Sequence, residues 1–216
     1  YFGTVLKMVV NNNKIIIAAL GLLSDPDGIS NIFRFDMNGN LDSSFGNGGK
    51  LVLENNSFCG QFCSVPFAIQ SNGNYLIGMQ KVTQVIGNNI HSDFITGSFN
   101  NNGQPDTEFG NNGFFSTEFE PTNEDVIWDI VVQNNGKMII AGSTYNATYN
   151  RNDITLCRIN TDGTLDNTFG TNGKVVTPAL GYIGSMGGKL LLHNNKINLV
   201  FTIGGDPLNK RFAILR

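Results

Sequence analysis

One twelve-residue segment occurs three times in the chain, and its recurrence is the strongest constraint on the fold. It reads NGNLDSSFGNGG from residue 38, NGQPDTEFGNNG from residue 102 and DGTLDNTFGTNG from residue 162. The common LD-xx-FG core is conspicuous in the first and third copies, and its Phe is Phe45, Phe109 or Phe169. A repeat of about 60 residues is long enough for one sheet, as in stacked or ring-shaped repeat proteins.

A second signal keeps the same period. An Asn followed by Gly or Asn stands between two apolar runs at Asn12-Asn13, Asn72-Gly73, Asn135-Gly136 and Asn194-Asn195. A two-residue type I′ hairpin turn needs positive φ at both central positions, which Gly and Asn tolerate best. We therefore predict a tight type I′ hairpin at each pair and four copies of the repeat.

The apolar runs between these turns predict four strands per copy. They are residues 5–10, 14–21, 31–35 and 50–53; 65–70, 74–80, 93–99 and 114–119; and 127–132, 137–143, 153–160 and 174–177. The fourth copy has three, at 189–193, 196–203 and 212–216. The chain is predicted to be all-β, a single repeat array over 1–216 with copies of roughly 1–54, 55–120, 121–178 and 179–216.

The second strand of each of the first three copies separates a propeller from a sandwich. Residues 15–19, 75–79 and 138–142 are almost continuously apolar, whereas a sandwich strand with one wet face would alternate. A β-propeller blade buries both faces of its inner strands between neighbouring blades. We predict about four four-stranded blades, the last one incomplete, as an arc of a larger ring; a solenoid of β-turns is the alternative, with a shorter repeat.

At these residues the chain resembles a known family. The run CRINTDGTLDNTFGTNGKV from Cys157 to Val175, with VVQNNGKMIIAGS before it, is similar to the delta-60 repeat, a bacterial-type β-propeller repeat. The resemblance implies the propeller fold and carries no catalytic or ligand assignment. The second copy departs from the pattern, with Ser98 where Arg34 and Arg158 stand and Pro105 in place of a Leu.

Composition excludes some partners. The net charge is -3 and only 14% of the residues are charged, with no local cluster of Lys and Arg, so nucleic acid and anionic membrane surfaces are poor partners. No apolar run approaches the roughly 20 residues that span a bilayer, so no membrane insertion is expected. The abundant Asn favours an extracellular, cell-surface or virion-associated setting over the cytoplasm.

The three cysteines, Cys59, Cys63 and Cys157, contain no CxxC pair. An odd count does not indicate a disulfide framework. We expect small buried hydrophobic residues, with local pairing of Cys59 and Cys63 left open.

The repeated turn offers a weak metal-binding candidate. Oxygen-bearing side chains with calcium-loop spacing recur as Asp36, Asn38 and Asp42; Asn100, Asn102 and Asp106; and Asn160, Asp162 and Asp166. The residue two places earlier is Arg34, Ser98 or Arg158, and a cation is a poor neighbour for Ca²⁺. We therefore expect Asx side chains that cap their own turns, and neither a metal nor a cofactor.

The same Arg suggests a structural role. Arg34 with Asp42, and Arg158 with Asp166, are predicted to form bidentate ion pairs that hold the turn. Phe45 and Phe169, like Phe109, could form a ligand platform, but their repetition favours apolar plugs between blades.

Acid–base chemistry has few candidates. His91 and His193 stand alone in the sequence, and lone histidines are usually structural or exposed. Glu124, Asp125 and Asp129 cluster around Trp128; they could be a general acid–base group, but a solvated loop is the simpler expectation. There is no GxSxG, HExxH or P-loop motif.

These observations predict that the chain is not an enzyme but a protein-interaction or scaffold module. Its partner would be another protein or further blades of the same assembly. Residues 22–30, 83–92 and 145–152 follow the second strands and differ between copies, as recognition loops do. The alternative is a carbohydrate-binding or hydrolytic propeller on a cell or particle surface.

Overall fold

The computed structural model of the chain describes residues 5–20, 30–53, 65–86, 89–119, 124–178, 187–194, 196–203 and 211–216. These residues form 15 β-strands, and each strand pairs antiparallel with the next strand of its sheet. The described part of the chain holds no helix that could cross a bilayer.

Each sheet is one contiguous stretch of sequence. The first comprises β1 (Val5–Asn11), β2 (Lys14–Leu20), β3 (Ser30–Asp36) and β4 (Lys50–Val52), and the second β5 (Phe67–Ile69), β6 (Tyr75–Ile86), β7 (Asn89–Phe99) and β8 (Phe114–Thr117). The third comprises β9 (Asp125–Val132), β10 (Met138–Asn146), β11 (Arg151–Ile159) and β12 (Lys174–Thr177), and the last β13 (Gly188–His193), β14 (Lys196–Ile203) and β15 (Arg211–Leu215). We refer to these sheets as blades one to four.

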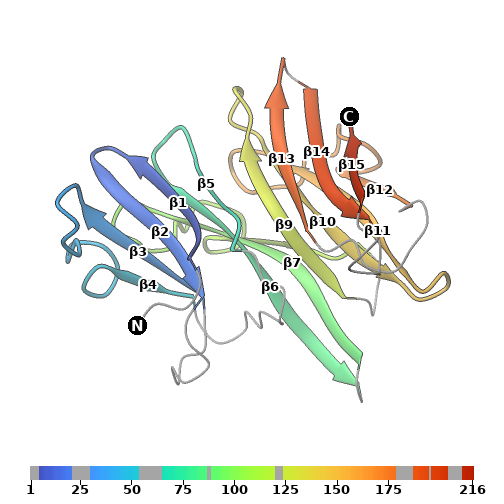
Figure 1. Cartoon of the computed structure of the whole chain (residues 1–216), viewed down its shortest axis with the longest axis horizontal. Coiled ribbons are helices and arrows are strands. Elements are labelled where there is room, and N and C mark those ends of the chain that lie inside the picture. The colour runs from blue at the N-terminus through green and yellow to red at the C-terminus, as the bar shows by residue number, and fades with distance from the viewer. Residues whose placement is uncertain are drawn as a thin grey trace.

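The blades follow one another in chain order and form a propeller (Figure 1). The first strands lie innermost, since β9 contacts both β5 of the preceding blade and β13 of the following one. The N-terminal and C-terminal blades lie at opposite ends of the row (Figure 1). The predicted all-β class and the propeller of four blades, the last with three strands, are confirmed.

The apolar core is divided among the blade interfaces. One cluster, with Ile16, Phe45 and Phe67, joins blades one and two. A second, with Phe94 and Phe109, joins blades two and three, and a third, with Trp128 and Phe201, joins blades three and four. Both faces of β6 near its start and of β10 are buried, as the continuous apolar runs predict.

The type I′ prediction for the first hairpins is right for the first copy and wrong for the second and third. Asn12 and Asn13 have φ of 48° and 55°. In the Asn72-Gly73 pair of blade two only Gly73 has positive φ, and its amide donates to the carbonyl of Gln70 at 2.9 Å. This is a three-residue loop that ends in a left-handed Gly, and Gly136 does the same in blade three.

Two predicted recognition loops are largely strand. Residues 83–86 and 89–92 extend the β6–β7 hairpin with only 87–88 between the strands. In blade three, β10 runs to Asn146 and β11 begins at Arg151. Antiparallel strands continue wherever backbone hydrogen bonds can form between them. Polar residues beyond the apolar runs therefore also belong to the strands. The third predicted loop falls mainly on 21–29, outside the described residues.

Candidate functional site

The two ends of the blades have different chemistry. One end carries the tight hairpins and the LD-xx-FG segments; we call it the turn face. The other end carries the β6–β7 and β10–β11 connections and the start of β9; we call it the loop face. The residues predicted as sites divide between these two faces.

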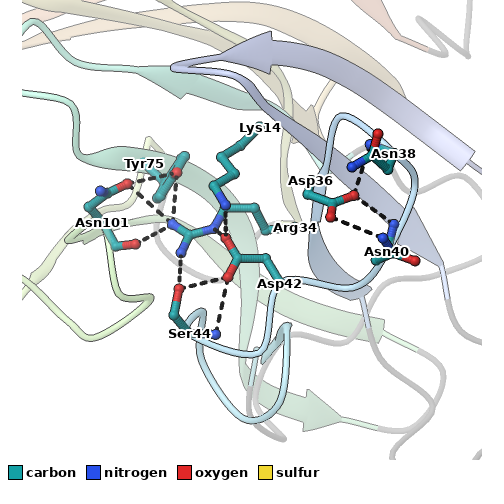
Figure 2. Close-up of polar contacts among 9 residues, drawn as sticks. All are labelled: Lys14, Arg34, Asp36, Asn38, Asn40, Asp42, Ser44, Tyr75 and Asn101. Carbon is teal, nitrogen blue, oxygen red and sulfur yellow. Dashed lines mark hydrogen bonds and ion pairs between the residues drawn. The ribbon is translucent and has the colours of Figure 1, made fainter.

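On the turn face, Arg34 binds several groups at once (Figure 2). Its Nε donates to Asp42 Oδ2 at 3.0 Å, and Nη2 donates to Ser44 Oγ at 3.0 Å. Nη1 donates to the backbone oxygen of Asn101 and lies 3.4 Å from Tyr75 Oη, both in blade two. The predicted pair is present, but the guanidinium spreads over several acceptors instead of meeting one carboxylate with two parallel bonds.

The third copy repeats part of this arrangement. Arg158 Nε lies 2.5 Å from Asp166 Oδ2, and Nη2 donates to Thr168 Oγ1 at 3.1 Å. The guanidinium stands over the ring of Phe169, 4.8 Å from its centroid. In the second copy, Ser98 Oγ is 3.4 Å from Asp106 Oδ2.

Lysines from the second strands complete both carboxylate sites. Lys14 Nζ is 2.8 Å from Asp42 Oδ2, and Lys137 Nζ is 2.8 Å from Asp166 Oδ2. The lysine hydrogen bond is the main cause that holds the pKa of each of these Asp carboxyls well below its usual range, and the adjacent hydroxyl adds to it. Both carboxylates are therefore occupied within their own blade.

The Asx side chains of the metal candidates are engaged in their turns. Asp36 Oδ1 accepts the amides of Asn38 and Asn40 at 2.9 and 2.8 Å (Figure 2), and its hydrogen bonds with Asn40 lower its pKa. Asn100 Oδ1 accepts two amides in the same way, and Asp162 Oδ1 accepts the Thr164 amide at 2.9 Å. Among the described residues, no three His, Cys, Asp or Glu side chains are placed to hold a metal.

On the loop face, the prediction that Glu124, Asp125 and Asp129 lie in a solvated loop is wrong for the two aspartates. Asp125 and Asp129 belong to the inner strand β9 and are 1% and 4% exposed. Glu124 precedes the strand and is exposed. The pairing of β9 with apolar β10 brought the two carboxyls into the blade interior.

Asp125 is the carboxyl group most altered by its surroundings. Its Oδ2 accepts the Phe119 amide at 2.8 Å, whereas its buried Oδ1 makes no hydrogen bond of good geometry with any described residue. Burial raises the pKa of Asp125 to about 7; the Thr144 hydroxyl and the Phe119 amide oppose this, and Asp93 adds to it. A carboxylic acid that is half protonated near neutral pH can give or take a proton.

Asp93 is the nearest candidate for a second carboxyl. It lies on β7, one residue after Ser92, whose Oγ donates to the backbone oxygen of Asp125 at 3.1 Å. Its pKa is raised, first by burial and then by Glu118. Asp125 of blade three and Asp93 of blade two are thus two acidic side chains with raised pKa, and the charge of Asp93 acts on Asp125.

Asp129 belongs to a separate cluster around the inner strands. Lys7 Nζ on β1 and Lys189 Nζ on β13 lie 3.9 and 3.7 Å from Asp129 Oδ1. A β-bulge shifts the register between β9 and β10, so that Asp129 pairs with Ala141 and Ile127 with Gly142. Sequence reasoning missed this cluster because its lysines stand at opposite ends of the chain.

The remaining candidates lie apart from these groups. His91 is buried, at 8% exposed, and His193 is exposed at the end of β13. Cys157 is fully buried, and burial raises the pKa of its thiol to about 12. Cys59 and Cys63 lie outside the described residues.

Comparison with protein families supports the repeat. The family described as "Domain of unknown function (DUF5122) beta-propeller" matches residues 11–45 and 133–169. Both segments run from a first hairpin to the Phe of the LD-xx-FG segment, in the first and third copies. The resemblance to a β-propeller repeat family is supported, and the divergent second copy lies outside the match. A comparison with curated proteins gave no significant match.

Solved structures share the fold at low sequence identity. An α-L-arabinofuranosidase from Lactobacillus brevis has a TM-score of 0.58 and 11% identity, over 96% of this chain and 65% of that one. An endo-arabinase from Bacteroides thetaiotaomicron has a TM-score of 0.53 and 8% identity, over 96% and 72%. A Dyadobacter fermentans protein of unknown function has a TM-score of 0.58 and 13% identity, over 96% and 59%. The chain spans less than two thirds of the first and third of these proteins.

This comparison contradicts the prediction that the chain is not an enzyme. Two of the similar structures are enzymes, so the absence of familiar catalytic motifs from a propeller sequence does not exclude catalysis. The scaffold interpretation gains no support from them. Motif searches fail here because a site on a propeller face draws residues from several blades.

Proposed function

We propose that the chain is a carbohydrate-binding or hydrolytic propeller whose site lies on the loop face around Asp125. The fold likeness to an arabinofuranosidase and an endo-arabinase favours a carbohydrate ligand. The observation that carries the proposal is Asp125 itself: a buried carboxyl at the start of an inner strand, with a pKa of about 7 and the Thr144 hydroxyl beside it, and with no hydrogen bond of good geometry from a described residue to Oδ1.

Hydrolysis of a glycosidic bond commonly needs one carboxylic acid that protonates the leaving oxygen and one carboxylate that attacks or activates water. An ordinary Asp is ionised at neutral pH and cannot serve as the acid. Asp125 retains its proton for a substantial fraction of the time near pH 7. Asp93 of the neighbouring blade is the candidate for the second role, because its charge contributes to the raised pKa of Asp125.

The test combines a glycan array with hydrolysis assays on arabinan and on 4-nitrophenyl α-L-arabinofuranoside. We expect binding to one sugar class and a rate that falls above about pH 7, as Asp125 loses its proton. Asp125→Asn should lower kcat by roughly 100-fold or more. Asp153→Asn is the matched control: Asp153 is an equally buried aspartate of blade three, but Arg151 and Asn146 satisfy its carboxylate.

Stability provides an independent check on the raised pKa. Because the folded-state pKa of Asp125, about 7, exceeds the ordinary value of 3.8 for an Asp in the unfolded chain, the folded protein binds more protons than the unfolded chain between these values. Its stability should therefore decline as pH rises from about 4 to 7, and Asp125→Asn should remove that part of the decline. Absence of both glycan binding and hydrolysis would overturn the proposal, whereas binding that Asp125→Asn leaves intact, without hydrolysis, would leave only the binding function.

Two finer assignments belong to the same proposal. First, the LD-xx-FG copies support assignment of the repeat to the delta-60 type. Second, a carbohydrate ligand is consistent with a protein located at a cell or particle surface. Further blades of the same repeat, or another protein, remain the proposed partners. Cell fractionation with an antibody against the chain tests the setting: recovery solely from the cytosol would refute it.

A further inference from the structure

Three charged residues meet at the inner strands, and no step proposed above uses them. Lys7 comes from β1 of blade one, Asp129 from β9 of blade three and Lys189 from β13 of blade four. Their side chains are 31%, 6% and 67% exposed. The cluster is thus a buried carboxylate flanked by two ammonium groups that reach solvent.

Some polar atoms of this cluster make no hydrogen bond to a described residue. Asp129 Oδ2 accepts the Leu190 amide at 3.0 Å, but its buried Oδ1 makes no hydrogen bond within the described part of the chain. The two ammonium groups lie 3.9 and 3.7 Å from Oδ1, beyond hydrogen-bond distance. Lys7 Nζ donates to the Phe67 carbonyl at 2.5 Å; Lys189 makes no side-chain hydrogen bond to a described residue.

The charges are also unbalanced. Two ammonium groups share one carboxylate, which leaves one positive charge in excess although the whole chain is acidic. Burial lowers the pKa of Lys7 and the nearby Lys189 lowers it further, while Asp129 opposes both. An anionic group between the two lysines would relieve this repulsion.

We infer that Lys7, Lys189 and Asp129 form a subsite for a uronic acid residue of a polysaccharide. The carboxylate of the sugar lies between the two lysines, and a neighbouring hydroxyl donates to Asp129 Oδ1. A simple anion without a hydroxyl would leave Oδ1 without a donor. A neutral sugar could satisfy Oδ1 but would leave the excess charge uncompensated.

This inference rests on the proposed carbohydrate function and specifies its substrate class. Asp129 follows Asp125 by four residues on β9, so the subsite lies along the same inner strand as the proposed acid. The titration calorimetry that tests it compares oligogalacturonides with neutral galacto-oligosaccharides of equal length. We expect the acidic oligomer to bind at least about tenfold more tightly and its affinity to fall with added salt.

Variants of the exposed lysine locate the subsite without disturbing the fold. Lys189→Gln should reduce oligogalacturonide affinity about tenfold and leave neutral oligomers unaffected, and Lys189→Arg should restore most of it. Lys196→Gln is the matched control, since Lys196 is an exposed lysine of the same blade that takes no part in the cluster.

The outcomes separate this inference from the proposed function. Equal affinity for acidic and neutral oligomers overturns the inference and leaves a carbohydrate function standing, whereas no binding to any glycan refutes both. Oligogalacturonide binding that Lys189→Gln does not weaken also overturns the inference. So does acetate binding as tight as that of the uronate, because acetate has no hydroxyl for Asp129.

Discussion

The LD-xx-FG segments of blades one and three share their Leu, Asp, Phe and Gly residues but have different surroundings. The Arg34 side chain is 4% exposed and Phe45 is fully buried, whereas the Arg158 side chain is 21% exposed and Phe169 is only partly buried. The difference comes from the next blade, whose Asn101 contacts Arg34 (Figure 2). The repeat sequence therefore determines the ion pair within a blade, and the neighbouring blade determines its burial.

Backbone contacts mark the same junctions. The Gly46 amide donates to the Asn102 carbonyl at 2.8 Å, and the Gly110 amide donates to the Asp162 carbonyl at 2.7 Å. Blades two and three thus each place their Asn-Gly or Asp-Gly turn on the Phe-Gly step of the blade before them. Arg158 and Phe169 have no such turn over them among the described residues.

The largest losses of stability are expected for the aromatic side chains of the two segments. Phe45→Ala should destabilise the protein by roughly 4 kcal/mol, because it leaves a cavity in a filled interface, and Phe169→Ala by roughly 2 kcal/mol. Urea unfolding followed by Trp128 fluorescence measures both. Equal losses would show that the following blade contributes little to this packing.

Each arginine substitution should cost less than the phenylalanine substitution in the same segment. Arg34→Met removes one partner of the nearly buried Asp42 carboxylate, which keeps Lys14, and also removes the link to Asn101, at a cost of roughly 3 kcal/mol. Arg158→Met, at a more exposed pair, should cost about 1 kcal/mol. If the two variants had the same midpoint of thermal unfolding, the contact between blades would not matter to the ion pair.

The smallest effect is expected at the turn glycines. A Cβ on Gly163 would lie 2.6 Å from the Gly110 amide nitrogen, whereas a Cβ on Gly39 would meet nothing within 4 Å. Both have positive φ, so Gly39→Ala should cost about 1 kcal/mol for the left-handed backbone alone, and Gly163→Ala roughly 2 kcal/mol with the added crowding. Calorimetric melting of the two variants compares them, and a larger loss for Gly39→Ala would contradict this account of the junction.

Local chemistry made the frame of the fold predictable from sequence. Turn residues and continuous apolar runs set the strands of each blade, and the eight-residue spacing of Arg34 and Asp42 placed two charges across one turn. Both features depend on residues close in sequence. The type I′ error at Gly73 arose because Asn-Gly also fits a longer loop in which only the Gly has positive φ.

The candidate site was less predictable because it depends on contacts between blades. The sequence around Asp125 indicated a loop, but Asp125 belongs to β9 and is buried by the pairing of β9 with β10. Lys7 and Lys189 are far apart in sequence and come close to each other only through the arrangement of the four sheets. The bulge beside Asp129 has no distinctive sequence signal, yet it sets where the carboxylate points. Long-range placement of this kind does not follow from spacing.

Each blade is a contiguous stretch of sequence, and the apolar core lies between the blades. This arrangement also determines the order in which the blades unfold. Each described blade is stabilised by its own ladder and by the blades beside it, as in a one-dimensional chain of coupled units. Blades two and three each pack on two described neighbours, and the outer blades on one. Amide hydrogen exchange should therefore be slowest in β6 and β10 and become faster toward both outer blades, with unfolding that spreads inward from the ends.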